Sequence, residues 1–263
     1  MIDSIRIKEL ADYVHTAEKE KYEVKKITAD LFPELTVEEA YLIQEEVVRQ
    51  KLEAGCKIVG PKMGLTSEAK MSQMKVDDPI YGFIFDYMVV EDGDSISIKN
   101  YIHPKVEPEI GFVLNQDLEG PNVTAFDVMQ ATEYIFPAIE IIDSRYEKFQ
   151  FTLPDVIADN TSASGVVFGT RLCKPDRFEL DVLGVTLSLN GEIRAMGTGA
   201  AVLGHPANSI ARLTQMLHKK GKKLTKGQPI LTGGVTEAFL VKPKDFVQVK
   251  VAGLGDVSFY VDE

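Results

Sequence analysis

The sequence predicts an α+β protein in which a helical N-terminal segment leads into a β-rich domain, and three observations carry this prediction. Apolar residues recur at helical spacing over roughly the first 55 residues. From about residue 57 onward, short runs of branched and aromatic residues alternate with Gly, Pro and Asp turns. The 263 residues are enough to bury a sizeable core. We therefore expect a helical segment over residues 1–56 and a β-rich domain over residues 57–263, packed as one structural unit.

The N-terminal segment predicts two helices. The first covers residues 4–20, where apolar residues are spaced among charged ones. The second begins after Thr36, because Glu39 three residues later completes a capping box, and it ends at Gly55. We expect the apolar stripes of both helices to form core or a subunit interface, and we assign them no chemistry.

The β-rich part predicts short strands separated by turns. Asn190-Gly191 between two apolar runs is typical of a type I′ hairpin turn. The expected strands cover residues 57–64, 80–90, 95–98, 105–115, 134–143, 165–172, 180–189, 192–197, 229–234, 238–242, 246–252 and 256–261.

Two further helices are expected between these strands. One follows Thr124, with Asp127 in the capping position, and runs to about Tyr134. The other starts near Pro206 and ends at Gly221, after a His and two Lys that suit a helix C-terminus.

Composition excludes some classes of partner. The formal net charge of −11 argues against nucleic acid, because phosphate binding needs a basic face. An anionic small substrate stays possible, since a bound metal and one Lys can invert the local field. Cys56 and Cys173 lie far apart without metal-type spacing, which favours a reduced, cytoplasmic protein. The N-terminus lacks the build of a signal peptide, and no apolar run is long enough to span a membrane.

Glu107 and Glu109 are candidate metal ligands. Alternate side chains of a strand share a face, so the two would point the same way and start roughly 7 Å apart. Two bare carboxylates at that distance repel by about 2 kcal/mol near a surface, and a divalent cation turns the repulsion into attraction. The alternative is a pair of solvated residues on an outward strand face. Pro108 between them predicts an edge strand or a bulge.

Glu140 is a third candidate, because it interrupts the apolar run 135–142. A buried charge needs a partner. That partner is either a metal site or a salt bridge to Arg145, and the residues alone leave both open.

Lys62 lies next to a possible site, in a stretch whose Gly64 allows close backbone approach. A partly buried Lys can act as an acid, a base or an anion clamp, whereas the alternative is a surface lysine. The polar loops 159–165 and 231–238 carry hydroxyls suited to binding carboxylates, and the alternative for each is a plain turn.

Other catalytic signatures find little support. His205 can serve as a base, but its place before a helix favours a cap or a core position. The sequence motifs of serine hydrolases, zincins and Rossmann folds are all absent.

Taken together, several segments resemble the fumarylacetoacetate hydrolase superfamily, in its hydratase/decarboxylase branch, over nearly the whole chain. The pieces are Lys62-Met-Gly-Leu-Thr-Ser67, Val76-Asp-Asp-Pro-Ile-Tyr-Gly82, Val106-Glu-Pro-Glu-Ile110, Ala138-Ile-Glu-Ile-Ile-Asp-Ser-Arg145, Asp159-Asn160, Gly204-His-Pro-Ala-Asn208 and Leu231-Thr-Gly-Gly-Val-Thr-Glu-Ala238. The resemblance implies a mixed β-roll or β-sandwich core. It also implies Mg²⁺ (or Mn²⁺) held by Glu107, Glu109 and Glu140.

Within this branch the chain is more similar to decarboxylases than to hydratases. Residues 62–67 are followed by Ala69-Lys-Met71 and Gln73-Met74, as in decarboxylases. Hydratases tend to carry an Asp where this chain has Ile80, and Ser-Gly-Ser where it has Thr232-Gly-Gly234. Lys75 stands where a Gly is usual in these enzymes, in a segment that we expect to form a turn.

The resemblance implies decarboxylation of 2-oxo-3-hexenedioate to 2-hydroxypenta-2,4-dienoate in aromatic meta-cleavage catabolism. Lys62 would orient the substrate or move a proton. The substrate contacts implied are Leu65, Ser162, Ser164 and Thr236. A homo-oligomer, and a complex with the pathway hydratase, are also implied.

Three alternatives remain. The first is hydration of 2-hydroxypentadienoate. The second is another reaction of the superfamily, such as C–C hydrolysis or isomerisation; hydrolysis needs a His–Glu pair, and only His15 precedes His103. The third is a non-enzymatic partner subunit, which would have no reason to keep the carboxylates and Lys62 together.

Overall fold

The computed structural model describes residues 2–67, 71–72 and 78–263, and its N-terminal part is helical as expected. Asp3 caps the first helix by accepting from the Arg6 N–H, and Thr36 with Glu39 forms the predicted capping box. The three helices are α1 (Ser4–Glu20), α2 (Ile27–Asp30) and α3 (Val37–Glu53). The sequence prediction missed the short α2.

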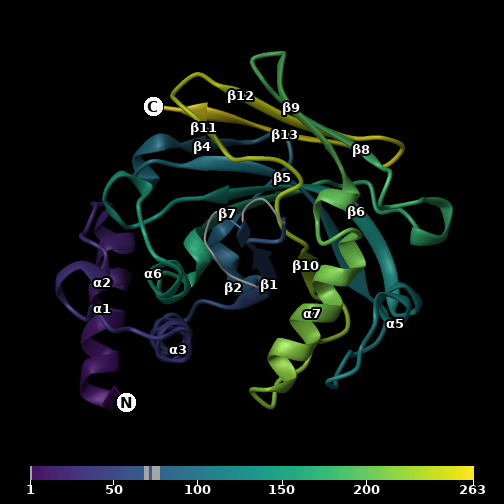
Figure 1. The fold of residues 1–263 in the computed structure, drawn as a ribbon. Coiled ribbons are helices and arrows are strands. Elements are labelled where there is room, and N and C mark those ends of the chain that lie inside the picture. Colours follow the sequence, from purple (N-terminus) through teal and green to yellow (C-terminus); the bar gives the residue numbers. More distant parts are fainter. Residues whose placement is uncertain (1, 68–70, 73–77) are drawn as a thin grey trace.

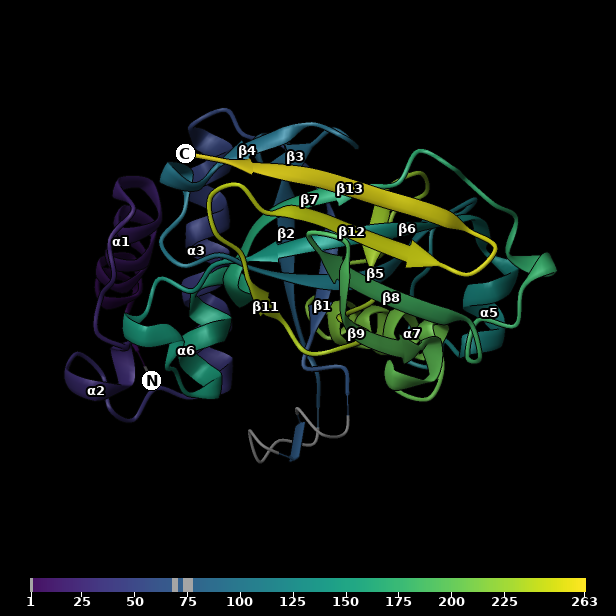
Figure 2. The same ribbon diagram turned by 90° about the horizontal axis from the view of Figure 1, so that it is seen from above.

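The strands form two sheets, and Figures 1 and 2 show the smaller sheet lying over the larger one. The larger sheet has the order β2-β1-β10-β5-β6-β7-β3, with β11 paired to β5, and the smaller has the order β4-β13-β12-β8-β9. Each contains parallel and antiparallel pairs, so both are mixed, as the resemblance implied. The strands of the larger sheet are β1 (Ile58–Gly64), β2 (Ile80–Phe85), β3 (Val89–Val90), β5 (Lys105–Leu114), β6 (Thr132–Ile142), β7 (Ala163–Phe168), β10 (Pro229–Leu231) and β11 (Phe239–Leu240). Those of the smaller sheet are β4 (Ser95–Ser97), β8 (Gly184–Leu189), β9 (Glu192–Thr198), β12 (Phe246–Val251) and β13 (Gly255–Asp262).

Three further helices are α5 (Ala125–Gln130), α6 (Leu153–Ala158) and α7 (Pro206–His218). The first was expected to reach about Tyr134, but it is shorter because β6 begins at Thr132. The prediction missed α6, although a capping box of Thr152 and Asp155 marks its start. His205 is the cap of α7 and accepts from the Ala207 N–H, as its position favoured.

The hairpin turn at Asn190-Gly191 is confirmed, since both residues have the positive φ that a type I′ turn requires. None of the helices in the described ranges is long and apolar enough to cross a membrane. Of the segments that carried the resemblance, residues 69–70 and 73–77, which include Lys75, lie outside the described residues.

Strand β5 lies inside the larger sheet, so the edge position predicted from Pro108 is wrong. The proline is tolerated because β10 pairs only with residues 111–113 of β5, and β11 only with residues 105–106. Between these two partners, the Pro108 carbonyl accepts from the Val235 N–H at 2.9 Å. The gap lets the loop after β10 approach the middle of β5.

Candidate metal and substrate site

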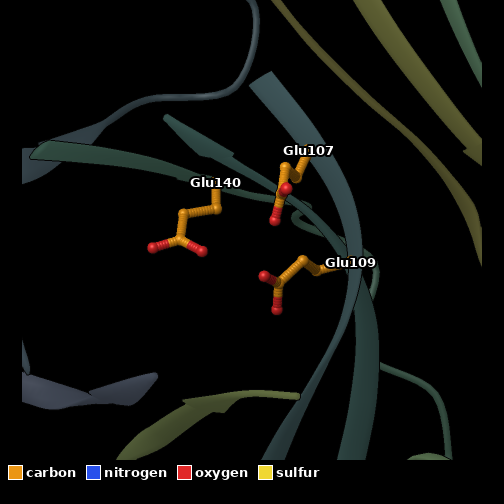
Figure 3. A group of neighbouring side chains, drawn as sticks. All are labelled: Glu107, Glu109 and Glu140. Carbon is orange, nitrogen blue, oxygen red and sulfur yellow. The ribbon is translucent and has the colours of Figure 1, made fainter. Parts of the chain in front are cut away.

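Glu107, Glu109 and Glu140 meet in the middle of the larger sheet. Glu107 and Glu109 alternate on β5, and the antiparallel register places Glu140 of β6 directly opposite Glu107. One carboxylate oxygen from each residue lies within 4.8 Å of the others, and Figure 3 shows the three side chains converging on one point. Glu109 and Glu140 are fully buried and Glu107 is 8 % exposed. The alternative of solvated residues on an outward face is therefore wrong.

The carboxylates are short of hydrogen-bond donors. Glu109 Oε2 accepts from the Gly233 N–H at 2.7 Å. Among the described residues, Glu109 Oε1 and Glu140 Oε2 are buried without a hydrogen-bond partner. Burial raises the pKa of Glu109 well above its ordinary value, and repulsion from Glu140 adds to the rise. Burial also raises the pKa of Glu140, although the nearby Lys62 ammonium opposes the shift.

This donor set fits a divalent cation. Three buried carboxylates that converge, with oxygens that lack a partner among the described residues, match the oxygen ligands that Mg²⁺ takes. A cation would satisfy both orphaned atoms and remove the repulsion that now raises the pKa values.

The Lys62 ammonium lies against the carboxylates. Lys62 lies on β1, is 2 % exposed, and its Nζ is 2.9 Å from Glu140 Oε1. The contact is an ion pair rather than a well-aligned hydrogen bond, because Glu140 Oε1 lacks hydrogen-bonding geometry. Nζ also donates to the Thr161 carbonyl at 3.0 Å. The surface-lysine alternative is therefore wrong.

Arg145 does not pair with Glu140, which rules out the salt bridge that the sequence left open. Its guanidinium is buried and binds the Asp159 carboxylate, and it also donates to the Asp159 carbonyl at 2.6 Å. A third contact, at 2.8 Å, goes to Ser164 Oγ. Arg145 thus fixes the chain on both sides of residues 160–162.

Residues 160–162 form a tight turn beside the site. All three have left-handed φ values, 46° for Asn160, 55° for Thr161 and 56° for Ser162. The Asn160 side chain holds the turn against β2 through two 2.9 Å hydrogen bonds with the Phe83 backbone. A Cβ at Gly82 would lie 2.6 Å from the Asn160 carbonyl oxygen, so this close approach requires glycine. The turn therefore aims the Thr161 carbonyl at Lys62.

A cavity of about 530 Å³ opens next to the carboxylates. It contains Lys62 and Glu107, and Ile80 forms part of its wall. The Ser162 hydroxyl is buried there without a hydrogen-bond partner in the described part of the chain. The remaining lining residues are Lys26, Gly64, Leu65, Lys105, Ile142, Phe149, Gln150, Phe151, Val156, Thr161, Glu237 and Ala238.

The structure brings two of the four expected substrate contacts to this cavity. Leu65 and Ser162 line it. Ser164 lies on β7 and accepts from Arg145, and the Thr236 hydroxyl donates to the Glu237 carbonyl at 3.0 Å. Neither is among the lining residues within the described ranges.

Sequence reasoning missed several lining residues, above all Lys26, Lys105 and Phe149. One signal was available for Lys105, because it precedes Glu107 by two positions and so shares its strand face. No comparable pattern pointed to Lys26 or Phe149, which come from a helix cap and a turn.

Known proteins resemble this chain along nearly its whole length. A 4-oxalocrotonate decarboxylase of Pseudomonas putida is 46 % identical over 249 residues, which is 95 % of this chain and 94 % of that protein. A 2-oxo-hept-4-ene-1,7-dioate hydratase of Escherichia coli is 37 % identical and covers 95 % of each chain.

A solved structure has the same fold as this chain. The 4-oxalocrotonate decarboxylase from Pseudomonas putida, complexed with magnesium and adipate, superposes with a TM-score of 0.97 at 43 % identity and covers 99 % of each chain. The family model described as fumarylacetoacetate (FAA) hydrolase C-terminal matches residues 58–262. The chain therefore belongs to the fumarylacetoacetate hydrolase family.

Proposed function

We propose that this protein is a 4-oxalocrotonate decarboxylase, which converts 2-oxo-3-hexenedioate to 2-hydroxypenta-2,4-dienoate and CO₂ in aromatic meta-cleavage catabolism. The observation that carries the proposal is the buried carboxylate triad beside Lys62, in a cavity whose wall at position 80 is apolar. Relatives of 46 % and 44 % identity bear the name of this enzyme.

Glu107, Glu109 and Glu140 are proposed to hold Mg²⁺ (or Mn²⁺). Their oxygens converge, and the similar 4-oxalocrotonate decarboxylase structure contains magnesium. When bound, the cation supplies a Lewis acid that stabilises negative charge developing on the 2-oxo group.

The reaction breaks the C5–C6 bond of the substrate. The electron pair of that bond shifts through the C3–C4 double bond to the C2 oxygen, C6 departs as CO₂, and one proton completes the 2-hydroxy group. Lys62 is proposed to orient the 2-oxo acid or to move this proton, because its ammonium is buried at the triad and fixed by the Thr161 carbonyl. Leu65 and the Ser162 hydroxyl, which has no hydrogen-bond partner among the described residues, are proposed substrate contacts.

Hydration of 2-hydroxypentadienoate is the competing reaction, since several relatives are hydratases. Ile80 disfavours it, because a branched alkyl group cannot activate water. The same side chain keeps negative charge away from a substrate that carries two carboxylates. Ile80 is 3 % exposed, so little of its side chain meets solvent.

The test is product analysis with purified protein, Mg²⁺ and 2-oxo-3-hexenedioate, following CO₂ release and dienol absorbance. Metal-dependent CO₂ release that disappears in Glu109→Gln supports the function and the site together. Water addition to 2-hydroxypentadienoate without CO₂ release would replace the proposal with the hydratase. Inactivity on both substrates would point to another reaction of the family or to a partner-subunit role.

We also propose a homo-oligomer that associates with the pathway hydratase in the cytoplasm. One chemical argument and one observation support this: the proposed product is an unstable enol that a neighbouring enzyme would intercept, and Ile193 and Met196 expose apolar surface on β9. Cys56 and Cys173 are free thiols, as a reducing compartment allows. Light scattering after size exclusion, with and without hydratase, measures both assemblies.

A further inference from the structure

We propose that Lys105, held over the ring of Phe149, is the specificity-determining residue that recognises the distal carboxylate of the substrate. The cavity would then accept 2-oxo dicarboxylates in preference to 2-oxo monocarboxylates of the same length. The inference rests on the proposed function, because it takes the 2-oxo acid end to lie at the carboxylate triad.

The placement of Lys105 matches the length of a six-carbon substrate. Lys105 begins β5 on the face that carries Glu107 and Glu109, and both Lys105 and Glu107 line the cavity. Two residues of a strand advance by roughly 7 Å. Four carbon–carbon bonds separate C2 from C6 in the substrate, roughly 5 Å in an extended chain with bonds near 1.5 Å. The far carboxylate therefore comes within reach of the Lys105 side chain.

The Lys105 ammonium is held over an aromatic ring, and the Glu107 carboxylate attracts it without a close ion pair. Its Nζ lies 4.0 Å from the centroid of the Phe149 ring, a cation–π contact. No carboxylate in the described ranges lies within ion-pair distance of it. Lys26 and Lys62 are the other lysines of the lining, and the acidic Glu237 at the same cavity is exposed. In a chain of net charge −11, these lining lysines favour an anion.

The turn that presents Phe149 has an uncommon backbone. Lys148 and Phe149 both have φ of 58°, a region that bulky side chains rarely adopt. The ring is fixed by His103 at 5.1 Å and Phe151 at 5.8 Å between centroids. The surroundings thus hold an aromatic face under the ammonium.

Lys105 is expected to act on binding rather than on bond breaking. An ammonium stabilises the carboxylate of the bound substrate more than the neutral CO₂ that forms from it, so it cannot raise the rate of that step. Lys105→Met should therefore raise KM for 2-oxo-3-hexenedioate, whereas kcat should stay the same or rise. After CO₂ has left, the Phe149 ring still holds the ammonium.

The experiment is calorimetric titration of the Mg²⁺-loaded protein with 2-oxoadipate and with 2-oxohexanoate. Both probes carry the 2-oxo acid group and lack the C3–C4 double bond, so neither is decarboxylated by this route. We expect 2-oxoadipate to bind about tenfold or more tightly than 2-oxohexanoate, as one charge-assisted hydrogen bond allows. In Lys105→Met the ratio should fall to about threefold or less. Lys105→Arg should retain most of the preference.

Lys148→Met is the matched control, because it removes a neighbouring exposed cation that does not line this cavity in the described residues. This variant should keep the wild-type ratio of the affinities for 2-oxoadipate and 2-oxohexanoate. Unchanged affinity of Lys105→Met for 2-oxohexanoate shows that the variant is folded, and if that affinity falls, Lys105→Gln gives the deciding ratio.

A wild-type protein without preference, or a preference that survives in the neutral variants, would overturn the inference. Failure of the proposed function gives a different result. A preference for 2-oxoadipate without CO₂ release from 2-oxo-3-hexenedioate would contradict the proposed reaction and support the proposed subsite. CO₂ release without a preference for 2-oxoadipate would contradict only the proposed subsite.

Discussion

Burial of Glu109 and Glu140 costs free energy in the metal-free protein, because each carboxylate loses water and repels its neighbours. The Gly233 N–H and the Lys62 ammonium offset part of this cost. Two oxygens still lack a donor among the described residues. At the scale of the residue, the site is thus pre-formed for a divalent cation, because Lys62 and the Gly233 N–H balance the buried carboxylates only in part.

Replacing Lys62 with Met should separate activity from metal affinity. We expect CO₂ release to fall by about 100-fold or more, because the group proposed to orient the substrate or to move the proton is gone. Mg²⁺ should bind more tightly, because a positive charge next to Glu140 no longer repels it. Turnover assays and calorimetry measure the two effects. Weaker Mg²⁺ binding would instead indicate that Lys62 mainly holds the triad in shape.

Replacing Ile80 with Asp tests why this wall of the cavity is apolar. The new carboxylate would repel the second carboxylate of the substrate, so we expect CO₂ release to fall at least about tenfold. Ile80→Asn is the control, because it has the same shape as the Asp variant without its charge. Equal losses in both variants would show that polarity or packing, rather than charge, matters at this position.

At the scale of the element, two neighbouring strands and the loop after β10 determine where the carboxylates lie. The β5–β6 register sets Glu107 opposite Glu140, and the gap between β10 and β11 admits the loop that donates to Glu109. A Cβ at Gly234 of that loop would lie 2.5 Å from Glu107 Oε2.

Gly234→Ala should therefore displace a proposed metal ligand without unfolding the protein. We expect Mg²⁺ affinity and CO₂ release to fall about tenfold, as for other changes that disturb ligand orientation. Gly184→Ala is a suitable control, since its nearest contact would be Ala252 at 4.0 Å. Wild-type Mg²⁺ affinity in Gly234→Ala would contradict the assignment of Glu107 as a ligand.

Glu18 couples helix α1 to helix α3 and makes stability depend on pH. Its carboxylate accepts from Lys51 Nζ at 2.6 Å and from Tyr87 Oη at 2.7 Å. Burial opposes ionisation, but the Lys51 ammonium and these hydrogen bonds lower the pKa of Glu18 from 4.5 to about 2. Burial lowers the pKa of Lys51 despite Glu18, so desolvation of the ammonium offsets part of the gain.

Because the folded pKa of Glu18 lies below the unfolded value, its stabilisation is present above pH 4.5 and is lost as the pH falls toward 2. A shift of this size corresponds to at most roughly 3 kcal/mol. Urea unfolding at a series of pH values should therefore show a steeper acid loss for wild type than for Glu18→Gln. Identical pH slopes would contradict the coupling.

At the scale of the whole molecule, metal binding should appear as thermal stability. Mg²⁺ at about 100 times its Kd should add about 2.7 kcal/mol, which raises Tm by about 5–10 °C in a chain of this size. Chelation with EDTA should reverse the shift. Glu109→Gln should not respond to Mg²⁺, yet its metal-free form should melt above metal-free wild type, because one buried charge is gone. A Mg²⁺ response in this variant would place the metal elsewhere.

Local patterns were reliable where the physical cause is local. The capping box at Thr36, the turn at Asn190-Gly191 and most strand positions follow from neighbouring residues and are confirmed. The end of α5 was misplaced, since the pairing of β6 decides where this helix stops, whereas α6 was missed although Thr152 and Asp155 form a local capping box. The division at residues 56 and 57 stays a prediction about folding units.

The sequence by itself determined that Glu107 and Glu109 share a face, because strand alternation needs only two positions along one chain. It also identified Glu140 and Lys62 as charges in apolar surroundings that need partners. Only the tertiary structure decided those partners. Glu140 reaches Glu107 through the pairing of β6 with β5, and it reaches Lys62 on β1, a strand far away in sequence. The same applies to Lys105 and Phe149, whose contact depends on how a turn folds back over β5.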